Sequence, residues 1–213
     1  MTARQDKLLA LFKAARIVPV LTIERIADAV PLARALVQGG VRTLEVTLRT
    51  PVALKAMEAI VRNVPGAIVG AGTVRNVADA QAARDAGCQF AVSPGYVHDV
   101  GVACHNIGLP LLPGVSTGSE VMQANIDGYH FLKFFPATAA GGIPMLKALA
   151  GPFHDVVFCP TGGITPETAP QFLALPNVKV CGGSWLTPND AVEAKDWKRI
   201  TQLAQDTAKL RRA

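Results

Sequence analysis

The sequence predicts an α/β fold, a (β/α)8 TIM barrel, on three observations. Short runs rich in β-branched residues alternate with longer segments of helical periodicity, a pattern typical of βαβ units on a parallel sheet. The alternation repeats eight times in 213 residues, with short connections. No Gly-x-Gly-x-x-Gly follows the first strand, which disfavours the alternative, a doubly wound open sheet. We therefore expect a single domain over residues 1–213, smaller than the ~250 residues typical of such barrels.

Eight strands are expected in chain order. They cover residues 17–23, 43–48, 67–73, 90–94, 110–115, 131–136, 156–161 and 178–184. Helical segments between them end at glycines such as Gly40 and Gly128, because glycine readily adopts the left-handed conformation that ends a helix. Before the first strand, residues 4–15 have the pattern of an extra amphipathic helix. We expect residues 1–16 to contain this N-terminal helix and the helix to pack on the bottom of the barrel.

The composition excludes several classes of protein. Half of the residues are hydrophobic and 17% are charged, so a large apolar core is available without disulfides or a structural metal. The 21 Lys and Arg outnumber the 16 Asp and Glu, a net charge of +5 that suits anionic partners. No basic stripe with interleaved aromatic residues accompanies this excess, so we expect phosphorylated metabolites rather than nucleic acid as partners.

Cysteine usage and the start of the chain predict a cytoplasmic protein. The cysteines lie far apart without a Cys-x-x-Cys pair, which is typical of reduced thiols. The apolar run at residues 8–12 is too short for a signal peptide or a membrane span, so no membrane association is expected. The four histidines show no metal-ligand spacing, and we expect neither a metal nor another cofactor.

Charged residues inside two predicted strands indicate a functional site. Along residues 43–49, strict alternation directs the apolar side chains toward the helices and Glu45 into the barrel. Arg49 follows at the C-terminal end of that strand, where barrels of this type place functional residues. Along residues 131–136, the same alternation places Lys133 inside the barrel among aromatic residues.

A buried lysine and a buried glutamate have two interpretations. Because unpaired buried charge is costly, Lys133 and Glu45 either form a purely structural ion pair or are kept for chemistry. A strand of the opposite phase would instead leave Lys133 in solvent. In the functional interpretation, burial disfavours the ammonium form, and the free amine attacks a ketone to form a Schiff base. Glu45 is then the natural general acid and base, directly or through a water.

Two glycine pairs predict a phosphate site. Gly162 and Gly163 follow the seventh predicted strand, and Gly182 and Gly183 precede Ser184 at the end of the eighth. Paired glycines alone commonly mark ordinary turns. After the last two strands of a barrel, however, they lie where phosphate usually binds, since unencumbered backbone amides and helix N-termini attract an anion there.

The same residues resemble a known family. Sequence segments 39–50, 69–74, 133–137, 150–153, 158–164 and 182–186 closely resemble the 2-keto-3-deoxy-6-phosphogluconate (KDPG) aldolase family, and the likeness runs from about the first strand to the C-terminus. The resemblance implies a homotrimeric barrel and a metal-independent class I aldolase. Such enzymes split KDPG into pyruvate and D-glyceraldehyde 3-phosphate in the Entner–Doudoroff pathway, and often also cleave 4-hydroxy-2-oxoglutarate (KHG) to pyruvate and glyoxylate.

The resemblance also implies a role for each matching residue. Lys133 matches the Schiff-base lysine and Glu45 the proton-transfer carboxylate. Thr161 matches a threonine that influences stereochemistry at the carbinol. Thr138 is a departure, because the family often has an acidic residue there, and this puts the substrate range in doubt. The implied pyruvate contacts are Arg49, Thr73, Pro94 and Phe135, and the implied phosphate pocket is Gly162, Gly163, Gly183 and Ser184.

Three functions remain open at this point. The first is cleavage of KDPG. The second keeps the Schiff base but takes KHG, or the galactonate epimer of KDPG, as the main substrate. The third is a catalytically silent barrel that binds sugar phosphates.

Overall fold

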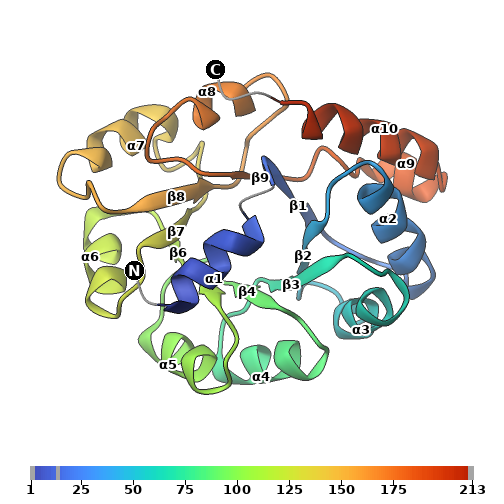
Figure 1. The fold of residues 1–213 in the computed structure, drawn as a ribbon, viewed down its shortest axis with the longest axis horizontal. Helices are drawn as coiled ribbons and strands as arrows, with labels where there is room; N and C mark the ends of the chain where they lie inside the picture. The colour runs from blue at the N-terminus through green and yellow to red at the C-terminus, as the bar shows by residue number, and fades with distance from the viewer. Residues whose placement is uncertain (1–2, 13–14, 211–213) are drawn as a thin grey trace.

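The computed structural model describes residues 3–12 and 15–210, in which short parallel strands are surrounded by helices (Figure 1). The strands are β1 Ile17–Leu21, β2 Thr43–Thr47, β3 Ile68–Gly72, β4 Phe90–Val92, β5 Leu111–Leu112, β6 Gly114–Val115, β7 Phe131–Phe134, β8 Val157–Pro160 and β9 Cys181–Gly183. The helices are α1 Ala3–Phe12, α2 Ile26–Gln38, α3 Ala53–Asn63, α4 Val77–Asp85, α5 His98–Asn106, α6 Gly118–Ile126, α7 Gly142–Ala150, α8 Ala169–Leu173, α9 Asn189–Glu193 and α10 Trp197–Ala208.

The strands form two curled parallel sheets. One has the order β5-β4-β3-β2-β1-β9 and the other the order β6-β7-β8. Each of the eight predicted strand segments contains a strand, so the prediction of an α/β fold on a parallel sheet is confirmed. The segment predicted at 110–115 is divided into β5 and β6 at Pro113, which has no N–H to donate to a sheet. Isolated bridges join Phe158 to Val178 and Thr161 to Gly182.

Strand alternation separates two hydrophobic clusters. Leu44 and Val46 of β2 belong to the larger cluster, which also contains residues of the surrounding helices. Phe131 of β7 belongs to a smaller cluster that α1 and several strands share. Glu45 lies between Leu44 and Val46, and Lys133 lies two residues after Phe131; both are also buried, each with 3% of its surface exposed. The sheets therefore enclose two charged groups on their inner side.

Helix α1 packs on the smaller cluster. Figure 1 shows this helix in front of the strands. The ring of Phe12 makes edge contacts with Phe90 and Phe131 at centroid distances of 5.0 and 5.6 Å. The amide of Gln5 donates to the carbonyl of Leu111 and accepts from the Phe131 N–H. These contacts cover the N-terminal ends of β5 and β7. Of the predicted helix at 4–15, residues 13 and 14 lie outside the described residues.

Left-handed glycines end several helices, as the sequence predicts. Gly40 after α2 has φ 92°, and Gly128 after α6 has φ 84°. Each turn brings the chain back to the start of the next strand within a few residues. Across the described ranges, no helix combines the length and the apolar character needed to cross a membrane.

Candidate active site

A lysine and a glutamate from different sheets meet inside the fold. The Nζ of Lys133 on β7 donates a hydrogen bond to Oε1 of Glu45 on β2, at 3.2 Å, and each side chain is only 4% exposed. Strand β3 makes room for this contact, because a Cβ atom on Gly72 would lie 2.4 Å from Oε1 of Glu45. The phase of both strands is therefore as predicted, and Lys133 does not face bulk solvent.

The pair lies beside a cavity of about 300 Å³. Lys133, Arg49, Phe135 and Thr161 line it, together with the glycine loop that follows β8 and the glycine pair at the end of β9. The Nζ of Lys133 lies 4.9 Å from the centroid of the Phe135 ring. An ion pair alone would fit a structural role, but here the amine borders a space that suits a small-molecule ligand. The site thus combines burial of the amine with access to it.

Arg49 and Thr73 lie together at the C-terminal ends of β2 and β3. The Nε of Arg49 donates to the hydroxyl of Thr73 at 3.1 Å. Thr73 has φ 61°, a left-handed conformation that is uncommon for a β-branched residue and that clusters at functional sites. This hydrogen bond limits the orientations of the guanidinium group, which lines the cavity.

The glycine pairs form part of the cavity wall. Gly162 and Gly163 have φ 101° and 76°, and both line the cavity with Gly183 and Ser184. A Cβ on Gly163 would lie 2.6 Å from the Thr138 hydroxyl, so this backbone needs glycine. Within the described part of the chain, the amides of Gly163 and Ser184 donate no hydrogen bond to protein, and an anion could accept from them.

Pro94 and Thr73 are not part of the described cavity lining. Pro94 follows β4 and packs its carbonyl group against Gly114, where a Cβ would lie 2.4 Å away. Sequence patterns also missed Val20 and Thr22, which line the cavity from the C-terminal end of β1. The only signal for Thr22 was its position near the C-terminal end of the first predicted strand, because a single threonine carries neither charge nor a glycine pair.

Cys159 on β8 pairs in register with Lys133 on β7, and its thiol is unreactive. It is 2% exposed, and its Sγ lies 3.9 Å from the Thr161 hydroxyl. Burial, with a further contribution from the charge of Glu45, raises the pKa of the Cys159 thiol to about 12. The thiol therefore stays protonated at neutral pH, and the nucleophile facing the cavity is Lys133.

A buried amine at the edge of a small-molecule cavity, with a carboxylate 3.2 Å away, is an arrangement that suits an enzyme with a lysine nucleophile. Comparison with protein families identifies which one. The family model described as "KDPG and KHG aldolase" matches residues 8–203, and the chain belongs to this family.

Individual relatives agree with this assignment. The chain is 52% identical over 195 residues to the 2-dehydro-3-deoxy-phosphogluconate aldolase of Pseudoalteromonas atlantica, covering 92% of this chain and 91% of the relative. The KDPG aldolase of Zymomonas mobilis ZM4, solved with 3-phosphoglycerate, has a TM-score of 0.94 and 46% identity over 98% of both chains. The KDPG aldolase of Legionella pneumophila, with pyruvate captured at low pH as a covalent carbinolamine intermediate, has a TM-score of 0.91 and 45% identity over 97% of this chain and 98% of that chain.

Proposed function

We propose that the protein is a class I aldolase that cleaves 2-dehydro-3-deoxy-6-phosphogluconate to pyruvate and D-glyceraldehyde 3-phosphate, as a step of the Entner–Doudoroff pathway. The observation that carries this proposal is the buried Lys133 amine, 3.2 Å from Glu45 at the edge of a cavity. The covalent pyruvate intermediate named for the L. pneumophila relative supports a covalent mechanism, here with Lys133 as the nucleophile.

Cleavage begins with a bond between Lys133 and the substrate. The free amine attacks the C2 ketone to give a carbinolamine, which loses water to form a protonated imine. The imine is an electron sink. Glu45 takes the proton from the C4 hydroxyl, the C3–C4 bond breaks, and its electron pair moves toward the imine. D-Glyceraldehyde 3-phosphate leaves, and the enamine of pyruvate remains on Lys133.

Release of pyruvate reverses the first half of the reaction. Glu45 returns its proton to C3 of the enamine, which restores the imine, and water hydrolyses the imine to pyruvate and the free amine. The 3.2 Å contact keeps the carboxylate within reach of the carbon atoms bonded through Lys133. One carboxylate can therefore serve as base in cleavage and as acid in protonation.

The remaining cavity residues orient the substrate. Arg49, held by Thr73, presents a planar two-pronged donor to the pyruvate carboxylate, a geometry that lysine cannot copy. Of the two residues expected to flank the pyruvyl portion, Phe135 lines the cavity and Pro94 does not, and Thr161 faces the carbinol carbon. The phosphate is bound by the backbone of Gly162, Gly163, Gly183 and Ser184, a role supported by the amides of Gly163 and Ser184, which donate no hydrogen bond to the described protein.

We extend the proposal to the whole chain. The parallel sheets close into a full (β/α)8 barrel of one domain, with α1 on its bottom, and the bridges between β8 and the β9 segment support closure. The protein works in the cytoplasm as a homotrimer, without metal or other cofactor.

The exposed apolar side chains Val97, Val102, Met122 and Ile126 on and beside α5 and α6 are candidates for a subunit contact.

The proposal is tested by trapping the protein with pyruvate and borohydride. Mass spectrometry of the digested protein should find a reduced pyruvyl group on the peptide that contains Lys133. Lys133→Ala should remove both the adduct and KDPG cleavage. A wild-type protein without an adduct, or an alanine variant with unchanged turnover, would show that the protein is not a Schiff-base aldolase.

KHG is the second candidate substrate, because the matching family carries both activities in its description. The two candidates differ in the phosphate group. Specificity constants, kcat/KM, for KDPG and for KHG distinguish them, since a working phosphate pocket favours KDPG. Equal constants would remove the phosphate role assigned to the glycine loops.

A further inference from the structure

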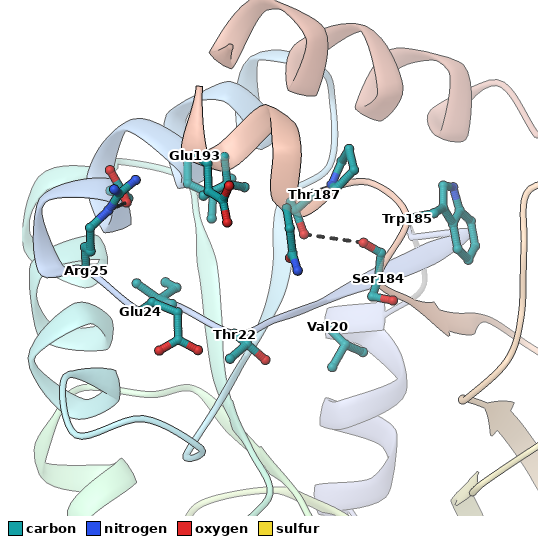
Figure 2. A pocket seen from close by; sticks show the side chains of 14 residues that line it. Val20, Thr22, Glu24, Arg25, Ser184, Trp185, Thr187 and Glu193 are labelled. Atoms are coloured by element: carbon teal, nitrogen blue, oxygen red, sulfur yellow. Dashed lines mark hydrogen bonds and ion pairs between the residues drawn. The ribbon is translucent and has the colours of Figure 1, made fainter. Parts of the chain in front are cut away.

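A second, larger cavity adjoins the one that contains Lys133. We call the 300 Å³ space the catalytic cavity and its neighbour, of about 680 Å³, the outer cavity. Val20, Thr22 and Ser184 line both. The outer cavity lies between the segment that leads from β1 into α2 and the segment that leads from β9 into α9 (Figure 2). A ligand that extends beyond Ser184 would therefore enter it.

The charges around the outer cavity are unbalanced. Arg25 is matched by Asp28, whose carboxylate accepts from its Nε at 2.7 Å and whose side chain is 6% exposed. Glu24 and Glu193 also line the cavity, and neither has an ion-pair partner among residues 3–12 and 15–210. Figure 2 shows both glutamates on the side away from Trp185. The excess negative charge repels phosphate and other anions.

The other lining groups suit hydroxyl-rich ligands. Thr22, Thr187 and Asn189 offer hydroxyl and amide groups, and the two glutamates add carboxylates that accept hydrogen bonds from hydroxyl groups. Trp185 contributes a half-buried aromatic ring, held against Gly183, where a Cβ atom would clash with it. An apolar face beside many hydrogen-bonding groups is complementary to an uncharged polyol chain.

We propose that the outer cavity extends the active site and binds the uncharged polyhydroxylated tail of aldehydes longer than three carbons. This inference rests on the proposed function. In the addition direction, C3 of the pyruvate enamine on Lys133 attacks the aldehyde carbon, a C–C bond forms, and the aldehyde oxygen takes the proton from Glu45. Water then hydrolyses the imine and releases a 4-hydroxy-2-oxo acid, so atoms and charges balance without a further reactant.

The test compares aldehydes that do and do not pass Ser184. D-Ribose is long enough to pass Ser184 and is uncharged, D-ribose 5-phosphate is its anionic counterpart, and D-glyceraldehyde 3-phosphate stays within the catalytic cavity. We expect pyruvate addition to D-ribose, and a lower kcat/KM for its phosphate. Asn189→Trp, at an exposed position that lines only the outer cavity, should lower the ratio of kcat/KM for D-ribose to that for D-glyceraldehyde 3-phosphate by about tenfold.

Two further variants make the test decisive. Val77→Trp places the same ring at an exposed residue on α4, away from both cavity linings, and should leave the ratio unchanged. Glu193→Lys should raise kcat/KM for D-ribose 5-phosphate relative to D-ribose, and it remains informative if Asn189→Trp does not fold. No product from D-ribose, or ratios unaltered in both outer-cavity variants, would overturn the inference. Absence of a pyruvate adduct on Lys133 would instead overturn the proposed function.

Discussion

At the scale of single residues, the site depends on one contact between two sheets. Lys133 belongs to the β6-β7-β8 sheet and Glu45 to the six-stranded sheet. We propose separate roles for them, Lys133 as the nucleophile that bonds to the substrate and Glu45 as the carboxylate that moves protons. Removing the charge of Glu45 should therefore affect one half of the reaction more than the other.

Glu45→Gln should lower kcat for KDPG cleavage by about a hundredfold or more, because the amide cannot accept the C4 hydroxyl proton. Adduct formation with pyruvate should remain measurable, since Lys133 is retained. Steady-state kinetics and borohydride trapping test the two halves separately. Normal turnover in the glutamine variant would mean that Glu45 is not the proton carrier.

Gly72→Ala should displace the Glu45 carboxylate, because the added Cβ would lie 2.4 Å from its Oε1. We expect kcat to fall roughly tenfold to a hundredfold, the cost of a small displacement in an active site. Gly95→Ala is the matched control, since nothing lies within 4 Å of a Cβ there. Equal kcat values for the two variants would argue against the positioning effect of Gly72.

Sequence reasoning predicted that Lys133 and Glu45 both point into the fold, because strand alternation fixes which side chains face inward. It could not predict the role of Gly72, since the need for space at that position arises from a neighbour on another strand. Thr22 was missed for a similar reason. Its importance comes from the two cavities that it borders, and these depend on how distant loops pack.

At the scale of elements, the start of α6 is stabilised by a capping box. The Thr117 hydroxyl accepts from the Glu120 N–H, and Oε2 of Glu120 accepts from the Ser116 and Thr117 amides, both at 2.8 Å. Partial burial acts to raise the pKa of Glu120, but these hydrogen bonds outweigh it and hold that pKa below its usual value. The stabilisation therefore requires the ionised carboxylate.

Glu120→Ala should lower the free energy of unfolding by about 1 kcal/mol at neutral pH. A lowered pKa in the folded state gives stability that is complete above the unfolded pKa and is lost as the pH falls through the folded one. The difference between variant and wild type should thus shrink as the pH falls below the ordinary glutamate pKa of about 4.3 and through the lowered folded pKa. Denaturant unfolding measures it, with the exposed Glu58→Ala as control. A difference independent of pH would exclude the charged cap.

The predicted fifth strand is divided into two short strands, β5 and β6. Pro113 lies in the middle of an apolar run whose composition favours a strand, and its missing N–H interrupts the hydrogen bonding. Pro113 was visible in the sequence, but a prediction based on apolar periodicity takes no account of a single missing backbone N–H. The residues at which β5 ends and β6 begins could therefore be assigned only from the structure.

At the scale of the whole molecule, α1 connects strands of both sheets. Phe12 contacts Phe90 of β4 and Phe131 of β7, which belong to different sheets. Phe12→Ala should lower the free energy of unfolding by about 3–5 kcal/mol, the usual cost of emptying a buried aromatic position. Denaturant unfolding measures this, and the exposed Lys7→Ala on the same helix should have little effect. A loss below about 1 kcal/mol would show that α1 is only loosely attached.

The strand order has a consequence for the growing polypeptide. Strand β9, residues Cys181–Gly183, pairs with β1 at the opposite end of the chain. A ribosome that has reached residue 160 has already made the reactive amine and its carboxylate partner, but not the strand that completes the edge of the six-stranded sheet. The part of the proposed phosphate pocket at Gly183 and Ser184 is therefore synthesised after Lys133 and Glu45, so that selectivity for phosphorylated substrates can arise only after both are in place.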